Sequence, residues 1–209
     1  MNYIGLPGAM WICARPSFER ELVNTLHFSK REASQITREA KKEYKKIIKT
    51  LPVFEKGDAF EPNTVNCALF SAFLLHMLKK PEVDVMTEYY SKAMMTAPVR
   101  FYYRQMGKKK FTTGDIKQQR KTAALKAADR NPYSWNMDYL PYEDGSGYEC
   151  RFERCGICTL MKELGVFEYT PAMCHLDYDM NDAGGTSRFM RQYTLASGGP
   201  YCDCGYKRL

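Results

Sequence analysis

The sequence predicts an α+β fold, with a helical N-terminal half followed by an antiparallel sheet of two hairpins with inserted helices. Two observations support this prediction. Residues 29–129 carry apolar residues at helical spacing between helix-start and helix-stop signals, whereas residues 133–208 contain alternating stretches separated by glycine turns. Because no internal repeat or low-complexity linker interrupts the chain, we expect a single domain over 1–209, helical over about 1–130 and cysteine-bearing over about 131–209.

The helical part is expected to contain four helices, over residues 29–51, 63–79, 84–97 and 114–129. Ser29 and Glu32 form a capping box that starts the first helix, because each side chain can accept from the other residue's backbone N–H. Pro98 is expected to end the third helix. These helices have apolar stripes and no catalytic constellation of their own.

The second part is expected to contain two hairpins and two helices. The motif "EDGSG" predicts a turn between extended residues 133–142 and a strand near 148–153, and "SGGP" predicts a second turn. Thr170 and Pro171 are typical N-cap and N1 residues. The remaining elements are expected over residues 155–164 and 171–182 as helices, and over 188–196 and 201–208 as strands.

Composition and charge narrow the class of protein. The 209 residues are 44% hydrophobic and 26% charged, with a net charge of +7 and no apolar run long enough to span a membrane. The first ten residues lack a signal-peptide pattern and the eight cysteines are too sparse for a disulfide scaffold, so we expect a cytoplasmic protein with reduced thiols and no membrane partner.

The basic residues are concentrated in the helical part. Residues 29–56 carry nine Lys/Arg against four acids, and residues 100–130 carry ten against two. The runs "KKEYKK" and "GKKK" lack the interleaved aromatics of nucleic-acid-binding segments, so we expect solvated helix faces and no nucleic acid as partner. A basic face can also steer an anionic small-molecule substrate. Oligomerisation stays open.

Six of the eight cysteines lie in the last 60 residues: Cys150, Cys155, Cys158, Cys174, Cys202 and Cys204. Single buried cysteines often act as small hydrophobes. In "MCHLDYDM", however, Cys174 and Asp177 share a helix face one turn apart, near a helix N-terminus that favours a thiolate. On the final strand Cys202 and Cys204 face one way and Asp203 the other. The residues alone leave packing and chemistry open.

The order of motifs in this part resembles the L-2-amino-thiazoline-4-carboxylic acid hydrolase family. The stretches that carry the resemblance are "CGICTLMKELGVFEYTPAMCHLD" and "RQYTLASGGPYCDC". The chain differs from the family pattern by carrying Cys204 in place of an aromatic residue and by adding Cys150 and Cys158. The arrangement also resembles small-molecule-binding domains of the vinyl-reductase type, which keeps a non-enzymatic small-molecule- or metal-binding sensor or scaffold as the alternative function.

The family resemblance implies hydrolysis of a cyclic amidine or isothiourea that carries a carboxylate. Such a reaction needs a nucleophile for the carbon between nitrogen and sulfur, and we assign it to Cys174. Asp177 is expected to hold the amidinium, and Arg191 to clamp the substrate carboxylate, because its planar fork matches that group. Cys202 is expected to be functional, and Asp203 to support a neighbouring group, both within the catalytic site.

A zinc mechanism is the rival hypothesis. Cys155, Cys174 and Cys202 would bind the metal and leave one position open for an activated water. His175, next to the proposed nucleophile, is a candidate fourth ligand or general base. Zinc is therefore the one cofactor that the sequence suggests, and the covalent and metal routes stay open at this point.

Overall fold

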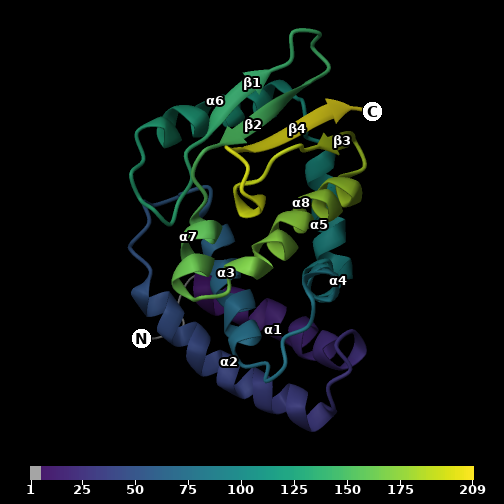
Figure 1. The fold of residues 1–209 in the computed structure, drawn as a ribbon. Coiled ribbons are helices and arrows are strands. Elements are labelled where there is room, and N and C mark those ends of the chain that lie inside the picture. The colour runs from purple at the N-terminus through teal and green to yellow at the C-terminus, as the bar shows by residue number, and fades with distance from the viewer. Residues whose placement is uncertain (1–5) are drawn as a thin grey trace.

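The computed structural model describes residues 6–209 and confirms the predicted α+β class (Figure 1). Residues 1–5, which begin the stretch tested above for a signal peptide, lie outside the described residues. The helices are α1 Leu6–Asn24, α2 Lys30–Thr50, α3 Glu61–Leu75, α4 Val83–Met94, α5 Ala97–Gly107, α6 Thr113–Ala127, α7 Gly156–Glu163 and α8 Thr170–Gly184. The strands are β1 Asp138–Pro141, β2 Gly147–Phe152, β3 Ser187–Met190 and β4 Cys202–Arg208, with short 3-10 turns η1 Phe167–Tyr169 and η2 Leu195–Ser197.

The predicted capping box starts α2. Ser29 Oγ accepts from the Glu32 backbone N–H at 3.2 Å, and the Glu32 carboxylate accepts from the Ser29 N–H at 2.8 Å. Pro98 does not end α4, contrary to the prediction, because α4 already ends at Met94. Pro98 lies instead in the first turn of α5, where its missing N–H costs nothing. The N-cap of α8 is Tyr169 rather than the expected Thr170, which already has helical backbone angles.

The four strands form one antiparallel sheet in the order β1-β2-β4-β3. The last strand of the chain therefore lies inside the sheet, where Cys204 is opposite Cys150 of β2 and Tyr206 is opposite Phe189 of β3. The second hairpin is looser than predicted. Strand β3 ends at Met190, and residues 191–201 form a loop that contains η2 instead of a tight glycine turn.

The main hydrophobic core lies among the helices below the sheet (Figure 1). Helix α3 is buried from Thr64 to Leu74, which explains its nearly unbroken apolar sequence. A second cluster lies under the inner face of the sheet, around Tyr148, Cys150 and Cys204. This inner face is the one that meets α6 and α8, so it positions the candidate site.

Helices α5 and α8 approach each other through glycine. A Cβ atom built on Gly107 would lie 2.3 Å from the carbonyl oxygen of Gly184, so no larger residue fits there without moving the backbone. Thr186 Oγ1 donates to the carbonyl of Gly107 at 2.9 Å, which adds a polar contact at the same junction. Over residues 6–209, no helix combines the length and the hydropathy that a membrane crossing requires.

Candidate active site

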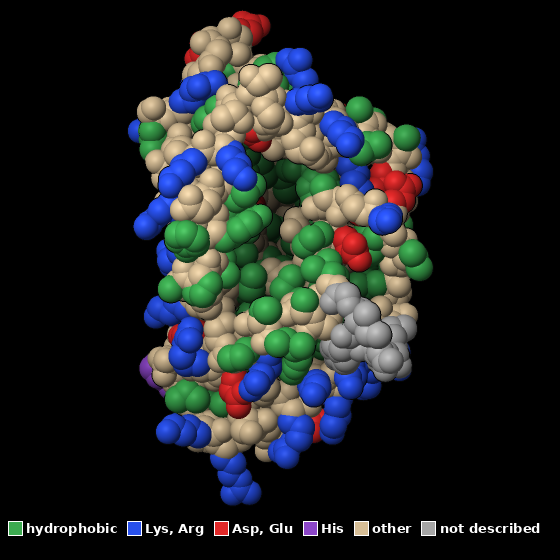
Figure 2. Space-filling model, turned by 180° about the vertical axis from the view of Figure 1, so that it is seen from behind, with side chains coloured by type: hydrophobic (Ala, Val, Ile, Leu, Met, Phe, Trp, Pro, Cys, Tyr) green, Lys and Arg blue, Asp and Glu red, His purple; other side chains and the backbone are tan. Residues whose placement is uncertain are grey.

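A cavity of about 490 Å³ lies between α5, α6, α8 and the inner face of the sheet. Figure 2 shows the molecule from this side, with a hollow whose interior is largely hydrophobic and whose rim carries several Lys and Arg side chains. Tyr103 and Met106 contribute from α5, and Asp177 and Met180 contribute from α8. An apolar cavity with a few convergent polar groups is the usual form of a small-molecule site.

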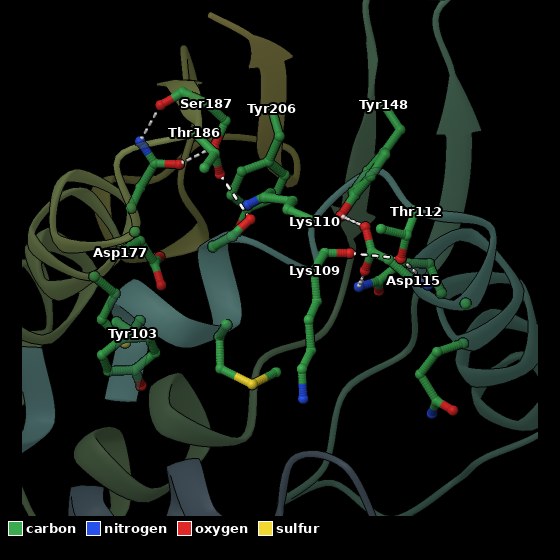
Figure 3. Close-up of a pocket in the computed structure, with 18 residues that line it drawn as sticks. Tyr103, Lys109, Lys110, Thr112, Asp115, Tyr148, Asp177, Thr186, Ser187 and Tyr206 are labelled. Carbon is green, nitrogen blue, oxygen red and sulfur yellow. Dashed lines mark hydrogen bonds between the residues drawn. The ribbon is translucent and has the colours of Figure 1, made fainter. Parts of the chain in front are cut away.

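Asp177 places a carboxylate on the α8 wall of the cavity (Figure 3). Its side chain keeps 34% of its surface accessible, on the side that faces the cavity, and protein atoms enclose the carboxyl group on its other sides. Burial raises the pKa of Asp177, and the nearby charge of Arg191 counteracts part of that rise. A raised pKa makes a carboxylate a stronger proton acceptor than an ordinary aspartate.

Arg191 holds Asp177 from within the protein. One guanidinium nitrogen lies 2.7 Å from the Asp177 carboxylate, and the other donates to the backbone carbonyl of Cys174 at 2.7 Å. The Arg191 side chain is only 6% exposed, and its guanidinium carbon lies 5.1 Å from the ring centre of Tyr178. The guanidinium therefore joins two successive turns of α8 and has little surface left for a ligand.

Asp203 fixes the loop that carries Arg191. Its carboxylate accepts from the backbone N–H groups of Gln192 at 2.9 Å and Tyr193 at 2.6 Å. As the two-residue strand period predicts, Asp203 lies on the opposite face of β4 from Cys202 and Cys204. It therefore acts on the site through the backbone next to Arg191, at the outer face of the sheet.

Lys110 supplies a cation inside the cavity, between the α8 wall and the wall formed by Asp115 and Tyr148 (Figure 3). Its Nζ atom lies 3.2 Å from the centre of the Tyr206 ring, a cation–π contact. Burial lowers the pKa of Lys110 to about 8, although Asp115 and Asp177 favour its charged form. The sequence predicted that the whole run GKKK is solvated. Lys108 and Lys109 are exposed, although Lys109 also borders the cavity, and the prediction missed the role of Lys110.

The wall opposite Asp177 is rigidly hydrogen-bonded. Asp115 accepts from the Phe111 backbone N–H at 2.8 Å and from the Tyr148 hydroxyl at 3.0 Å. Gln119 also donates to the Asp115 carboxylate, at 3.1 Å. Asp115 thus accepts three hydrogen bonds from the protein, so Asp177 is the more available carboxylate for a ligand.

The three cysteines proposed as zinc ligands come from separate elements and lie near one another. Cys155 is the N-cap of α7, Cys174 lies in α8 and Cys202 begins β4; we call these three residues the thiol cluster. Burial raises the pKa of Cys174, and Cys155 and Asp177 raise it further. Burial also raises the pKa of Cys202, to about 11, while the backbone N–H of Leu195, 3.2 Å from its sulfur, counteracts part of that rise.

Among residues 6–209, no group of three or more Cys, His, Asp or Glu side chains is arranged to hold a metal ion. Cys155 instead contacts the thiol of Cys158, which raises its pKa together with burial. His175 is exposed and lies against Tyr178, with 5.6 Å between ring centres. Zinc binding by the thiol cluster therefore stays a prediction, one that requires the thiol side chains to reorient.

The structure joins some of the predicted site residues and separates others. Asp177 lines the cavity, and Arg191 links it to the turn of Cys174. Cys174 itself is half-buried, does not line the cavity and lies one helical turn from Asp177. Cys204 is 7% exposed and packs under the sheet, as expected of a packing residue.

Comparison with known proteins gives one match. The family model described as L-2-amino-thiazoline-4-carboxylic acid hydrolase matches residues 62–206, which include the cavity walls and the thiol cluster. No curated protein and no solved structure matches the chain. Since the matched region covers well over half of the sequence and contains the whole candidate site, this chain belongs to the L-2-amino-thiazoline-4-carboxylic acid hydrolase family.

Proposed function

We propose that this protein hydrolyses a small zwitterionic ring, 2-amino-thiazoline-4-carboxylate or a close relative. The observation that carries the proposal is the pair of opposite charges facing one cavity, Asp177 on α8 and Lys110 on the segment after α5. Lys110 Nζ rests on the Tyr206 ring rather than against a carboxylate of the described residues, so it is available to an anionic ligand. The family name supports the same reaction class.

In this proposal the substrate carboxylate binds Lys110 and the substrate amidinium binds Asp177. Arg191, which the sequence suggested as the carboxylate clamp, becomes a positioning residue because its guanidinium is occupied by Asp177 and the carbonyl of Cys174. The cationic rim of the hollow attracts the anionic end of the substrate.

Cys174 is the proposed nucleophile, which requires its side chain to turn from the thiol cluster toward the cavity that Asp177 lines. Its raised pKa keeps it a thiol, so it needs a base, and Asp177 one turn away on the same helix face can take the proton. The sulfur adds to the carbon between nitrogen and sulfur, the ring C–S bond breaks, and the departing thiolate takes the proton from Asp177. Water then attacks the enzyme-bound carbon, which restores the Cys174 thiol and leaves a urea on the product.

The test is release of thiol from the ring by purified protein, followed with a thiol reagent. We expect turnover by the wild type, a loss of at least about a hundredfold in Cys174→Ala and Asp177→Asn, and a covalent adduct on Cys174 by mass spectrometry. Lys110→Met should raise KM, because it removes the proposed contact with the substrate carboxylate. If folded protein releases no thiol, with or without added zinc, the sensor or scaffold alternative replaces the hydrolase.

The zinc route is tested with the same samples. Full activity of metal-free protein would exclude it, whereas stoichiometric zinc whose removal abolishes turnover would replace the covalent mechanism. Activity that survives Cys174→Ala but not Asp177→Asn would identify a water activated by Asp177 as the nucleophile.

A further inference from the structure

A second chamber of about 320 Å³ opens beside the first one. Its walls include Ala59, Phe60, Thr122, Met137, Cys150 and Phe152. Five residues line both chambers, so the two hollows share a boundary: Lys110, Gln118, Gln119, Tyr148 and Tyr206. Lys110, the proposed anchor for the substrate carboxylate, therefore lies where the chambers meet.

The two chambers differ in chemistry. The first contains Asp115, Asp177, Lys109 and Lys110, whereas Lys110 is the one charged residue among those that line the second. Four aromatic rings line the second chamber beside polar side chains: Phe60 and Phe152 meet edge to face at 5.7 Å, and Tyr148 and Tyr206 lie 5.6 Å apart on the sheet side. These four rings offer edges and faces against which an aromatic group can pack.

The volume of the second chamber also indicates a ligand larger than a single small ring. Cavities of roughly 300–1,000 Å³ accommodate drug-sized ligands. A single small ring with an amino and a carboxylate group would bind its two charges within the first chamber and leave the second without an occupant. Burying an apolar group in that space would add affinity that the charged contacts do not supply.

We propose that the substrate is an aryl-bearing relative of the thiazoline carboxylate, with its charged ring in the first chamber and its aromatic group in the second. The inference rests on the proposed function for the position of the charged ring. Because Lys110 lines both chambers, a ligand whose carboxylate binds it can extend a substituent on the neighbouring ring carbon into the second chamber.

The test compares binding of 2-amino-thiazoline-4-carboxylate with that of its 5-phenyl derivative, measured by calorimetry in the Cys174→Ala background so that neither ligand is consumed. We expect the phenyl group to lower Kd by at least about tenfold. Ala59→Trp, at an exposed wall position of the second chamber, should remove this gain and change the Kd of the bare ring by less than about twofold. Ala124→Trp, also exposed but outside both chambers, is the matched control and should keep the gain.

Equal affinity for the two ligands, or a phenyl gain that Ala59→Trp leaves intact, would overturn the inference. This failure is distinct from failure of the proposed hydrolysis. A wild type that hydrolyses the bare ring without any phenyl preference refutes the second chamber alone. A protein that binds the phenyl compound in an Ala59→Trp-sensitive way but releases no thiol refutes the reaction and leaves the chamber assignment standing.

Discussion

Arg191→Met is expected to lower both the stability of the protein and its activity, because it removes the cation that holds Asp177. The Arg191 side chain is 6% exposed, and its two 2.7 Å contacts reach the Asp177 carboxylate and the Cys174 carbonyl. Removing one partner of a buried ion pair costs about 3–5 kcal/mol. Because Asp177 is 34% exposed to the cavity, water can replace part of the lost contact, and we expect a loss of about 2–3 kcal/mol.

The measurement is thermal unfolding at neutral pH together with the rate of thiol release. A chain of this size loses about 2–4 °C in Tm per kcal/mol, so the expected drop is roughly 4–12 °C. Arg191→Met combined with Asp177→Asn is the matched control: with the charge also removed, the double variant should lose clearly less than the sum of the two single losses. Additive losses, or a single-variant drop below about 2 °C, would show that the pair is not coupled as the geometry indicates.

Further expectations concern other groups of the site. Asp203→Asn should stay folded but lose about 1–2 kcal/mol and some turnover, because one of two backbone N–H groups loses a charged acceptor; unchanged unfolding and kinetics would contradict this. Since the pKa of Lys110 is lowered to about 8, affinity for a carboxylate ligand should fall as pH rises through that value. In Lys110→Met the affinity should be weak and should not change with pH over the same range. Because burial raises the pKa of Asp177, the folded chain binds that proton more tightly than the unfolded chain, so stability should decline as pH rises above about 4; Asp177→Asn should show a smaller decline in urea titrations. Thiol release should continue after a chelator has removed metal, as checked by elemental analysis of the same samples. Parallel loss of zinc and of activity would instead support the zinc mechanism.

Much of the fold was predictable because its local signals agree with its tertiary packing. The capping box of α2 and the EDGSG turn act within a few residues, so no distant contact had to be known. Helix α1 escaped prediction because Pro16 and two-sided packing blur its apolar stripe. Helix α5 escaped because a proline after a helix reads equally as a stop or as a first-turn residue.

The candidate site was predictable only in part. The pairing of Cys174 with Asp177 follows from helical periodicity, and the outward direction of Asp203 follows from strand periodicity. The burial of Lys110 does not, since three consecutive lysines carry no local signal that distinguishes the two that line the cavity, or the one that is partly buried there. Likewise, the binding of Arg191 to Asp177 depends on how the loop after β3 crosses α8, which no local pattern specifies.

The glycine junction of Gly107 and Gly184 bears on how this scaffold can acquire new specificities. Backbone rests against backbone there, so the spacing of α5 and α8 is set independently of the side chains that face the ligand. Tyr103, Met106 and Met180 can therefore be exchanged to reshape the mouth of the cavity while the frame that holds Asp177 stays in register. Directed evolution toward other ring substrates should accumulate substitutions at such lining positions and leave the two glycines unchanged.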